Sequence, residues 1–256
     1  MRALEAREAR LLLAAATGFS EASVLAHPER ELPADAAARF LDYAARRERG
    51  EPIAYILGTK EFYGLPLAVN PAVLIPRPET ELLVDLALAH APASVLDLGT
   101  GCGAIALALK RHLPAARVVA VERSAAALAV ARRNALKLGL EVDFRHGLWF
   151  EPVAGERFDL VVSNPPYVAM DDAHLQQGDL RFEPQSALVA GPEGLDALRD
   201  IVRGAPSHLN PGGWLLVEHG LGQDAAVRGL LREAGFDEIH TWPDLAGIPR
   251  VAGGRR

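Results

Sequence analysis

The sequence predicts an α/β protein with a largely parallel sheet, helices on both faces of the sheet, and a small helical module in front. Three observations support this. From Ala93 onward, strand-like and helix-like segments alternate. Before Arg49 the chain is rich in Ala, Leu, Arg and Glu with helical periodicity. Its 256 residues, 50% of them hydrophobic, suffice for one large core and one smaller unit.

The first 50 residues contain helical patterns separated by turn signals at Thr17-Gly18, His27-Pro28 and Leu32-Pro33. Asp35 is expected to cap the last of these helices, and Gly50 to end it. Basic residues before the apolar run 11–16 imitate a secretory signal, but acidic residues interrupt them and the run is short. This stretch therefore predicts an ordinary amphipathic helix.

Between Glu51 and Pro78, prolines and glycines separate short apolar pieces, which predicts a hairpin connector. We therefore divide the chain into a helical domain, 1–50, a hairpin linker, 51–78, and an α/β domain, 79–256. Within the last domain, strands are expected at 94–98, 117–122, 142–146, 158–163, 213–219 and 236–242, and helices at 104–112, 125–138, 195–209 and 223–234.

Composition limits the possible partners and compartments. The net charge is −6, and neither half of the chain is strongly basic, which argues against direct binding of nucleic acid. A single cysteine, Cys102, excludes an internal disulfide and a multi-thiolate metal site. No apolar stretch approaches the ~20 residues that span a bilayer. We expect a cytoplasmic, monomeric protein that neither contacts a membrane nor binds a metal.

A glycine loop follows the first predicted strand of the α/β domain. Residues 95–104 read Val-Leu-Asp-Leu-Gly-Thr-Gly-Cys-Gly-Ala, in which Gly99, Gly101 and Gly103 permit close approach of a ligand to the backbone and to helix N–H groups. Glu122 ends the next strand, where a carboxylate can accept hydrogen bonds from both hydroxyls of a ribose. The pair predicts a nucleoside-containing cofactor. The alternative for the loop alone is a tight strand-to-helix turn.

The most specific signal is Asn164-Pro165-Pro166-Tyr167, directly after a predicted strand. An amide nitrogen is a poor nucleophile, and it becomes increasingly positive as it attacks a sulfonium methyl. Acceptors aimed at its hydrogens therefore stabilise the transition state more than the ground state. We expect the Asn164 side-chain oxygen and the Pro165 carbonyl to be those acceptors, and Tyr167 to lay its ring on the planar amide. The alternative is a rigid turn.

The chain resembles the bacterial release-factor glutamine N5-methyltransferases, the PrmC/HemK family, nearly from end to end. The residues that carry the resemblance are Ile75-Pro-Arg-Pro-Glu-Thr-Glu81, the glycine loop, Asn164 to Tyr167, Arg181-Phe-Glu-Pro184 and Asp244-Leu-Ala-Gly247. Asn-Pro-Pro-Tyr alone is shared with adenine N6 methyltransferases that act on DNA.

The resemblance implies a seven-stranded, Rossmann-like class I methyltransferase sheet with a reversed last strand, joined by a hairpin to a small helical domain that helps hold the substrate. It implies S-adenosylmethionine as the cofactor and, as the partner, a class-1 peptide chain release factor whose Gly-Gly-Gln glutamine is methylated. By position, the cofactor-binding residues would be Gly99, Thr100, Gly101, Cys102, Gly103, Glu122, Trp149 and Asn164. Asn164, Pro165, Pro166 and Tyr167 would bind the glutamine, with Asn164, Pro165 and Tyr167 catalytic.

Two residues depart from the family pattern. Glu122 stands where such enzymes often have aspartate, and its longer side chain still reaches a ribose. Leu148 stands where relatives tend to carry an acidic residue that could contact the adenine amine, so that contact stays open. Trp149 could instead be a half-buried core aromatic, and Cys102 is expected to pack rather than react.

Two other functions compete with glutamine methylation. An adenine N6 methyltransferase faces the same chemical problem, but it would need a basic surface for phosphates and a means to extrude the base. A non-catalytic nucleotide-binding or translation-factor-binding module is the other, and cofactor turnover would exclude it.

Overall fold

The computed structural model describes residues 4–256. They form two compact units, which are described separately: one comprises residues up to Thr59 together with 173–182, and the other comprises 60–172 and 183–256. None of the helices within residues 4–256 is long and apolar enough to cross a membrane.

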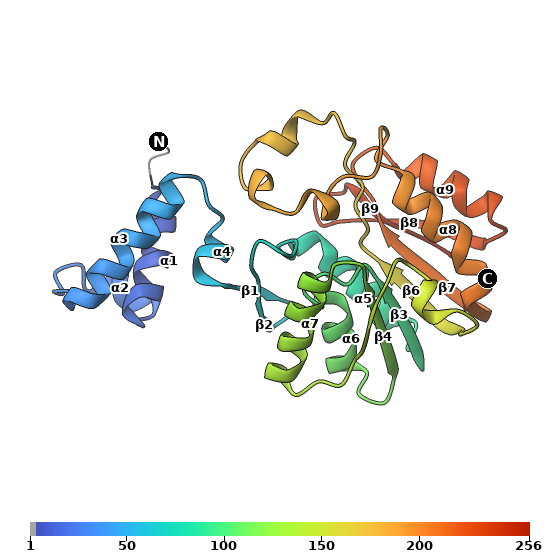
Figure 1. Cartoon of the computed structure of the whole chain (residues 1–256), viewed down its shortest axis with the longest axis horizontal. Coiled ribbons are helices and arrows are strands. Elements are labelled where there is room, and N and C mark those ends of the chain that lie inside the picture. Colours follow the sequence, from blue (N-terminus) through green and yellow to red (C-terminus); the bar gives the residue numbers. More distant parts are fainter. Residues whose placement is uncertain (1–3) are drawn as a thin grey trace. The chain divides into compact units, whose positions relative to one another are not determined.

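The smaller unit is helical. Arg47 is 5% exposed, and its guanidinium bonds Glu8 at 2.7 Å and Asp179 at 3.0 Å. The helices pack around small apolar side chains such as Leu12 and Ala36. Its helices are α1 (Ala6–Thr17), α2 (Glu21–Ala26), α3 (Ala34–Glu48) and α4 (Ile53–Leu57), which are coloured blue in Figure 1. The unit also includes the short helices η3 (Ala173–Gln176) and η4 (Leu180–Phe182).

One local prediction for this region was wrong. Asp35 does not cap α3: the helix begins at Ala34 after Pro33, and Asp35 instead pairs with Arg39 one turn later at 2.8 Å. The linker expected over 51–78 begins with α4, and its hairpin is confined to strands β1 (Thr59–Phe62) and β2 (Leu65–Ala68). Pro52 precedes α4, where its fixed φ suits a helix start.

The compact units are also divided differently from the three predicted segments. The first boundary falls after Thr59, and residues 173–182 join the smaller unit. The Arg47–Asp179 pair joins residues 132 positions apart. Such a long-range ion pair leaves no local sequence signal, so the inserted segment could not be anticipated.

The larger unit contains a seven-stranded sheet of order β5-β4-β3-β6-β7-β9-β8. Only β9, the last strand along the chain, runs antiparallel to its neighbours. The predicted fold class is confirmed, including the reversed last strand. The strands are β3 (Ser94–Leu98), β4 (Arg117–Glu122), β5 (Asp143–His146), β6 (Phe158–Ser163), β7 (Leu209–Glu218), β8 (Asp237–Pro243) and β9 (Pro249–Arg255).

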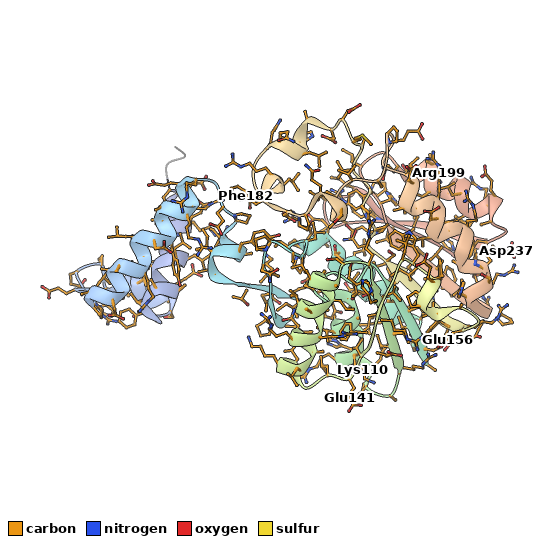
Figure 2. The ribbon with its side chains drawn as sticks, viewed as in Figure 1. Lys110, Glu141, Glu156, Phe182, Arg199 and Asp237 are labelled. Carbon is orange, nitrogen blue, oxygen red and sulfur yellow. The ribbon has the colours of Figure 1, made fainter. Side chains whose placement is uncertain are left out.

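Helices cover both faces of this sheet, as expected. Figure 1 shows α5 (Glu81–Ala89), α6 (Ala104–His112) and α7 (Ala125–Leu138) on one face, and α8 (Asp196–His208) and α9 (Asp224–Glu233) on the other. Central strand residues such as Leu96, Val161 and Leu215 are fully buried between the layers. Charged side chains such as those of Lys110 and Arg199 lie on the outer surface (Figure 2).

Strand β9 was not among the strands expected from the residue pattern. Its Gly253 and Gly254 have low strand propensity, yet both lie where a side chain does not fit. A Cβ at Gly253 would approach the Leu216 side chain to 2.5 Å, and one at Gly254 would approach Phe236 to 2.9 Å. Close packing against β7 and the residue before β8 therefore requires glycine in this strand.

The strand order reverses between β3 and β6, which pair side by side with Leu98 opposite Ser163. In open α/β sheets, ligands bind beyond the carboxyl ends of the strands at such a switch point. The glycine loop and Asn164 both follow this edge directly. The fold therefore brings together the two most specific motifs of the sequence.

Candidate active site

A cavity that opens to solvent lies at the carboxyl ends of β3, β4 and β6. Of the predicted site residues, Gly99, Gly101, Glu122, Trp149, Asn164 and Pro166 line it; Thr100, Cys102, Gly103, Pro165 and Tyr167 are not in the lining. The wall is completed by Ala72, Val73, Leu74, Val121, Arg123, Ser124, Ala127, Gly147, Leu148, Pro184, Ser186 and Ala187.

The glycine loop is held open by its backbone conformation. Gly99 and Gly101 have φ values of 72° and 59°, in the left-handed region that favours glycine. The N–H groups of Gly99 and Thr100 donate to the Val121 carbonyl at 2.9 and 3.1 Å, which ties the loop to β4. The loop therefore presents glycine backbone, without side chains, to the cavity.

The other loop residues support this conformation from behind. Thr100 donates to a buried Asp97 carboxyl oxygen at 2.6 Å. Cys102 is buried, and burial raises the pKa of its thiol to about 12, so the thiol stays protonated and packs. A Cβ at Gly103 would lie 3.0 Å from Leu107, so glycine is needed for close packing at the start of α6. The structure supplies no contact between these three residues and the cavity.

Asp97 was missed by the sequence reasoning, although it lies within the quoted loop motif. It is fully buried, and its Oδ2 accepts from Thr100 and from the Ala106 N–H at 3.2 Å. Burial raises the pKa of its carboxyl to about 7, against the lowering effect of these bonds. Asp97 thus joins the end of β3 to both sides of the loop.

Glu122 stands at the end of β4 with both carboxyl oxygens fixed. Oε2 accepts from the Gly101 N–H at 3.0 Å, and Oε1 accepts from the Ser124 N–H at 2.8 Å. Each carboxylate oxygen has a second lone pair, so both can still accept a hydroxyl hydrogen. The side chain is 8% exposed and lines the cavity, which suits recognition of a diol.

Trp149 combines the two roles that the sequence left open. It packs against the hydrophobic core and also lines the cavity. Its φ of 46° is unusual for a bulky residue, and such strain is concentrated at functional sites. Its ring lies over the loop, since a Cβ at Gly99 would be 3.4 Å from it. Leu148 beside it is 37% exposed and offers no acceptor from its side chain.

The Asn-Pro-Pro-Tyr segment extends from the cavity into the protein interior. The Asn164 Nδ2 donates to the Thr80 hydroxyl at 3.0 Å. Pro165 is buried, and Pro166 lines the cavity. The Tyr167 hydroxyl donates to Glu218 at 3.1 Å, and its ring packs against the core. Burial and the neighbouring Glu218 carboxyl raise the pKa of Tyr167. Its predicted stacking on a substrate amide stays a prediction.

An ion pair between Arg77 and the buried Glu183 joins two walls of the cavity. The second Glu183 oxygen accepts from the Ile75 N–H at 3.2 Å. Residues 72–74, which precede Arg77, and Pro184, Ser186 and Ala187, which follow Glu183, contribute to the lining. Arg77 and Glu183 both lie in segments that carry the family resemblance, and neither of them was assigned a role from the sequence.

The last motif of the family resemblance, residues 244–247, does not line the cavity. Asp244 closes the turn between β8 and β9, accepting from the N–H groups of Ala246 and Ile248 and pairing with Arg250 at 3.1 Å. No group of His, Cys, Asp and Glu within residues 4–256 could hold a metal ion.

Comparison with known proteins agrees with this geometry. A family model described as Methyltransferase small domain matches residues 78–180, and one described as PrmC N-terminal domain matches residues 2–58. The release factor glutamine methyltransferase of Bordetella pertussis is 52% identical over 252 residues, covering 96% of this chain and 93% of the relative. That of Xylella fastidiosa is 51% identical over 257 residues, covering 98% and 94%. This chain belongs to the release factor glutamine methyltransferase family.

The fold is shared more widely than the family. A crystal structure of a methyltransferase from Pyrococcus furiosus is 19% identical, with a TM-score of 0.60 over 84% of this chain and 98% of that one. The expected enzyme class, a methyltransferase that uses S-adenosylmethionine, is confirmed by the family. The competing adenine N6 activity is not the one that these relatives carry.

The cavity has the features that S-adenosylmethionine requires. A carboxylate at Glu122, an aromatic ring at Trp149 and glycine backbone at Gly99 and Gly101 line the cavity. These groups suit a ribose, an adenine ring and the polar amino-acid end of the cofactor respectively. The predicted residue-by-residue assignment of cofactor contacts stays a proposal.

Proposed function

We propose that this protein transfers the methyl group of S-adenosylmethionine to the side-chain amide nitrogen (N5) of the glutamine in the Gly-Gly-Gln motif of class-1 peptide chain release factors, and so supports translation termination. The observation that carries the proposal is the position of Asn164. Its side chain lines the cavity beside the glycine loop, and its Nδ2 is tied back to Thr80. Its Oδ1 is therefore free to accept from a substrate.

When bound, S-adenosylmethionine would supply an electrophilic sulfonium methyl for the substrate nitrogen, with S-adenosylhomocysteine as the neutral thioether leaving group. The protein acts on the glutamine amide. Asn164 Oδ1 and the Pro165 carbonyl accept its two hydrogens, which orients the nitrogen and stabilises the positive charge that grows on it. Because that charge makes the nitrogen strongly acidic, its proton can pass to solvent without a strong base in the site.

The test is to incubate the protein with S-adenosylmethionine and a class-1 release factor, and to locate the methyl group by peptide mass spectrometry. A matched release factor with alanine in place of the Gly-Gly-Gln glutamine is the control, and an adenine-containing oligonucleotide is offered in parallel. Methylation of that glutamine alone supports the proposal. Transfer to adenine instead would favour the competing N6 activity.

We further propose that the predicted helical domain docks the release factor. Two leucines of this domain, Leu25 in α2 and Leu41 in α3, are 64% and 66% exposed, so a substitution at either can test docking without removing a core side chain. Leu41→Glu should raise the KM for the whole release factor and leave that for a short glutamine peptide unchanged. Leu136→Glu, at an 84% exposed leucine of α7, is the matched control. Equal effects of Leu41→Glu on both substrates would refute docking.

We also propose that the protein acts in the cytoplasm as a monomer. A single cysteine and a translation factor as the proposed substrate both suit a reducing compartment. Sedimentation of the purified protein would test the monomer.

A further inference from the structure

The main-chain carbonyl of Tyr167 is held by the side chain of Gln223, which lies in the turn between β7 and α9. The Gln223 Nε2 donates to the Tyr167 oxygen at 3.0 Å, and its Oε1 accepts from the Gly220 N–H at 2.8 Å. The same NH₂ group lies 3.3 Å from the Gly194 oxygen and 3.4 Å from the Glu193 oxygen. Gln223 therefore joins the last residue of the Asn-Pro-Pro-Tyr segment to two other loops.

The chemistry of these partners fixes which way the Gln223 amide points. The Gly220 N–H can only donate, and the three carbonyl oxygens can only accept. The amide oxygen must therefore face Gly220, and the amide nitrogen must face Tyr167. An ionised glutamate of the same size could accept from Gly220, but it would set its second oxygen against the three carbonyl oxygens. The position thus requires a neutral amide.

Two buried glycines enclose Tyr167 on other sides. A Cβ at Gly194 would lie 2.3 Å from the Tyr167 carbonyl oxygen, and one at Gly220 would lie 3.2 Å from Cδ2 of the ring. The Tyr167 hydroxyl donates to Glu218 at 3.1 Å. The carbonyl, the ring and the hydroxyl of Tyr167 are therefore each confined by a different neighbour.

Both ends of the Asn-Pro-Pro-Tyr segment are anchored. Ser163, directly before it, is paired in the sheet and donates its hydroxyl to the Leu98 carbonyl at 2.7 Å. Gln223 holds the other end through the Tyr167 carbonyl. The two prolines between these anchors have φ angles that are fixed by their rings. A shift of the Tyr167 carbonyl would therefore be passed along the segment to Asn164.

We infer that Gln223 is a positioning residue for methyl transfer, which holds the segment so that the Asn164 oxygen and the Pro165 carbonyl face the substrate amide. This inference rests on the proposed function, because it requires those two oxygens to accept hydrogens from a glutamine. Neither Gln223 nor Gly194 lines the cavity, so their effect on the reaction must pass through the segment. Displacing the segment slows the chemical step and leaves the Glu122 side of the cavity unchanged.

Two substitutions disturb the Tyr167 carbonyl by different means. Gln223→Glu replaces the NH₂ donor with an oxygen at nearly constant size, and Gly194→Ala places a methyl group against the carbonyl oxygen. Each has a matched control. Ala226→Glu adds the same negative charge at an exposed position of α9. Gly235→Ala adds the same methyl group at a glycine of similar φ, 78° against 71°, with open space around it.

The assay is a single turnover of methyl transfer to a class-1 release factor, with S-adenosylmethionine and folded enzyme in saturating excess over the release factor. Under these conditions the rate constant does not depend on how much of the protein is folded. Gln223→Glu and Gly194→Ala should each lower the rate constant about tenfold, because small misplacements of reacting groups are costly. Both controls should keep the rate constant of the unaltered protein. Calorimetry should show an unchanged cofactor Kd in all four variants.

A fall in both test variants that is absent from both controls supports the inference. Rate constants equal to those of the controls would overturn it, because Gln223 would then serve the stability of the fold alone. A rise in cofactor Kd as large as the fall in rate would also overturn it. If one test variant does not fold, the other decides the question by the same comparison. Failure of the proposed function would appear differently, as absence of glutamine methylation by the unaltered protein.

Discussion

Glu122 gives the sharpest prediction for cofactor binding. Glu122→Gln keeps the size of the side chain but replaces one acceptor oxygen with an NH₂ group. In the structure both oxygens already accept backbone N–H groups, from Gly101 at 3.0 Å and Ser124 at 2.8 Å. The new NH₂ group must therefore face one of these donors, and it can no longer accept from a ribose hydroxyl.

The expected loss is that of one hydrogen bond to a charged group, about 1.5–3 kcal/mol. This corresponds to a rise of roughly 10- to 150-fold in the Kd for S-adenosylmethionine. At saturating cofactor, kcat should change far less, since Glu122 does not contact the reacting methyl. Isothermal titration calorimetry gives the Kd directly, and a single-turnover assay gives the rate.

Glu141→Gln is the matched control, since Glu141 is an exposed glutamate after α7 (Figure 2). It removes the same charge from the same unit without touching the cavity, and cofactor Kd should be unchanged. If Glu122→Gln binds the cofactor as tightly as this control does, Glu122 does not hold the ribose.

Three further predictions concern the supporting structure. Arg47→Ala removes the buried guanidinium that pairs with Glu8 and Asp179, and should destabilise the helical unit by about 3 kcal/mol in thermal unfolding; an unchanged Tm would refute this. Glu183→Gln weakens the ion pair with Arg77, and calorimetry should show a cofactor Kd raised roughly tenfold, whereas an unchanged Kd would mean that the pair does not order the cavity. For Glu218, burial raises the pKa from 4.5 to about 7, so the folded state retains a proton that the unfolded state has released, and stability is lost as pH rises through this window. Glu218→Gln lacks this loss, so its free energy of unfolding relative to the unaltered protein should increase by on the order of 3 kcal/mol between about pH 5 and about pH 8; parallel pH profiles in urea unfolding would contradict the assignment.

The sequence predicted most strands of the sheet and its flanking helices, because the apolar patterns that indicate them depend on residues that are close together in the chain. The strands ending at Leu98, Glu122 and Ser163 end where the apolar runs end. The glycine loop and Asn164 meet because parallel strands place their carboxyl ends at one edge. For these elements, the periodicity of apolar residues and the positions of glycine and proline are sufficient to predict where each strand or helix lies.

What escaped prediction depends on contacts distant in sequence. Strand β9 contains Gly253 and Gly254, which are more typical of a loop than of a strand. Glycine is needed at these positions because the side chains of Leu216 and Phe236 pack closely against the strand. Asp179 joins the helical unit through an arginine 132 residues away. In the sequence Glu218 is an ordinary residue at the end of a predicted strand, and its hydrogen bond with Tyr167 forms only when β7 lies beside β6.

The central claim is that acceptors at Asn164 carry methyl transfer to a glutamine amide. The most direct test is the single-turnover rate constant of Asn164→Ala with a class-1 release factor at saturating S-adenosylmethionine. The account predicts a fall of about 10²–10³-fold, as for loss of one oxyanion-type partner, with cofactor Kd changed little. A rate within a few fold of the unaltered protein would remove Asn164 from the mechanism.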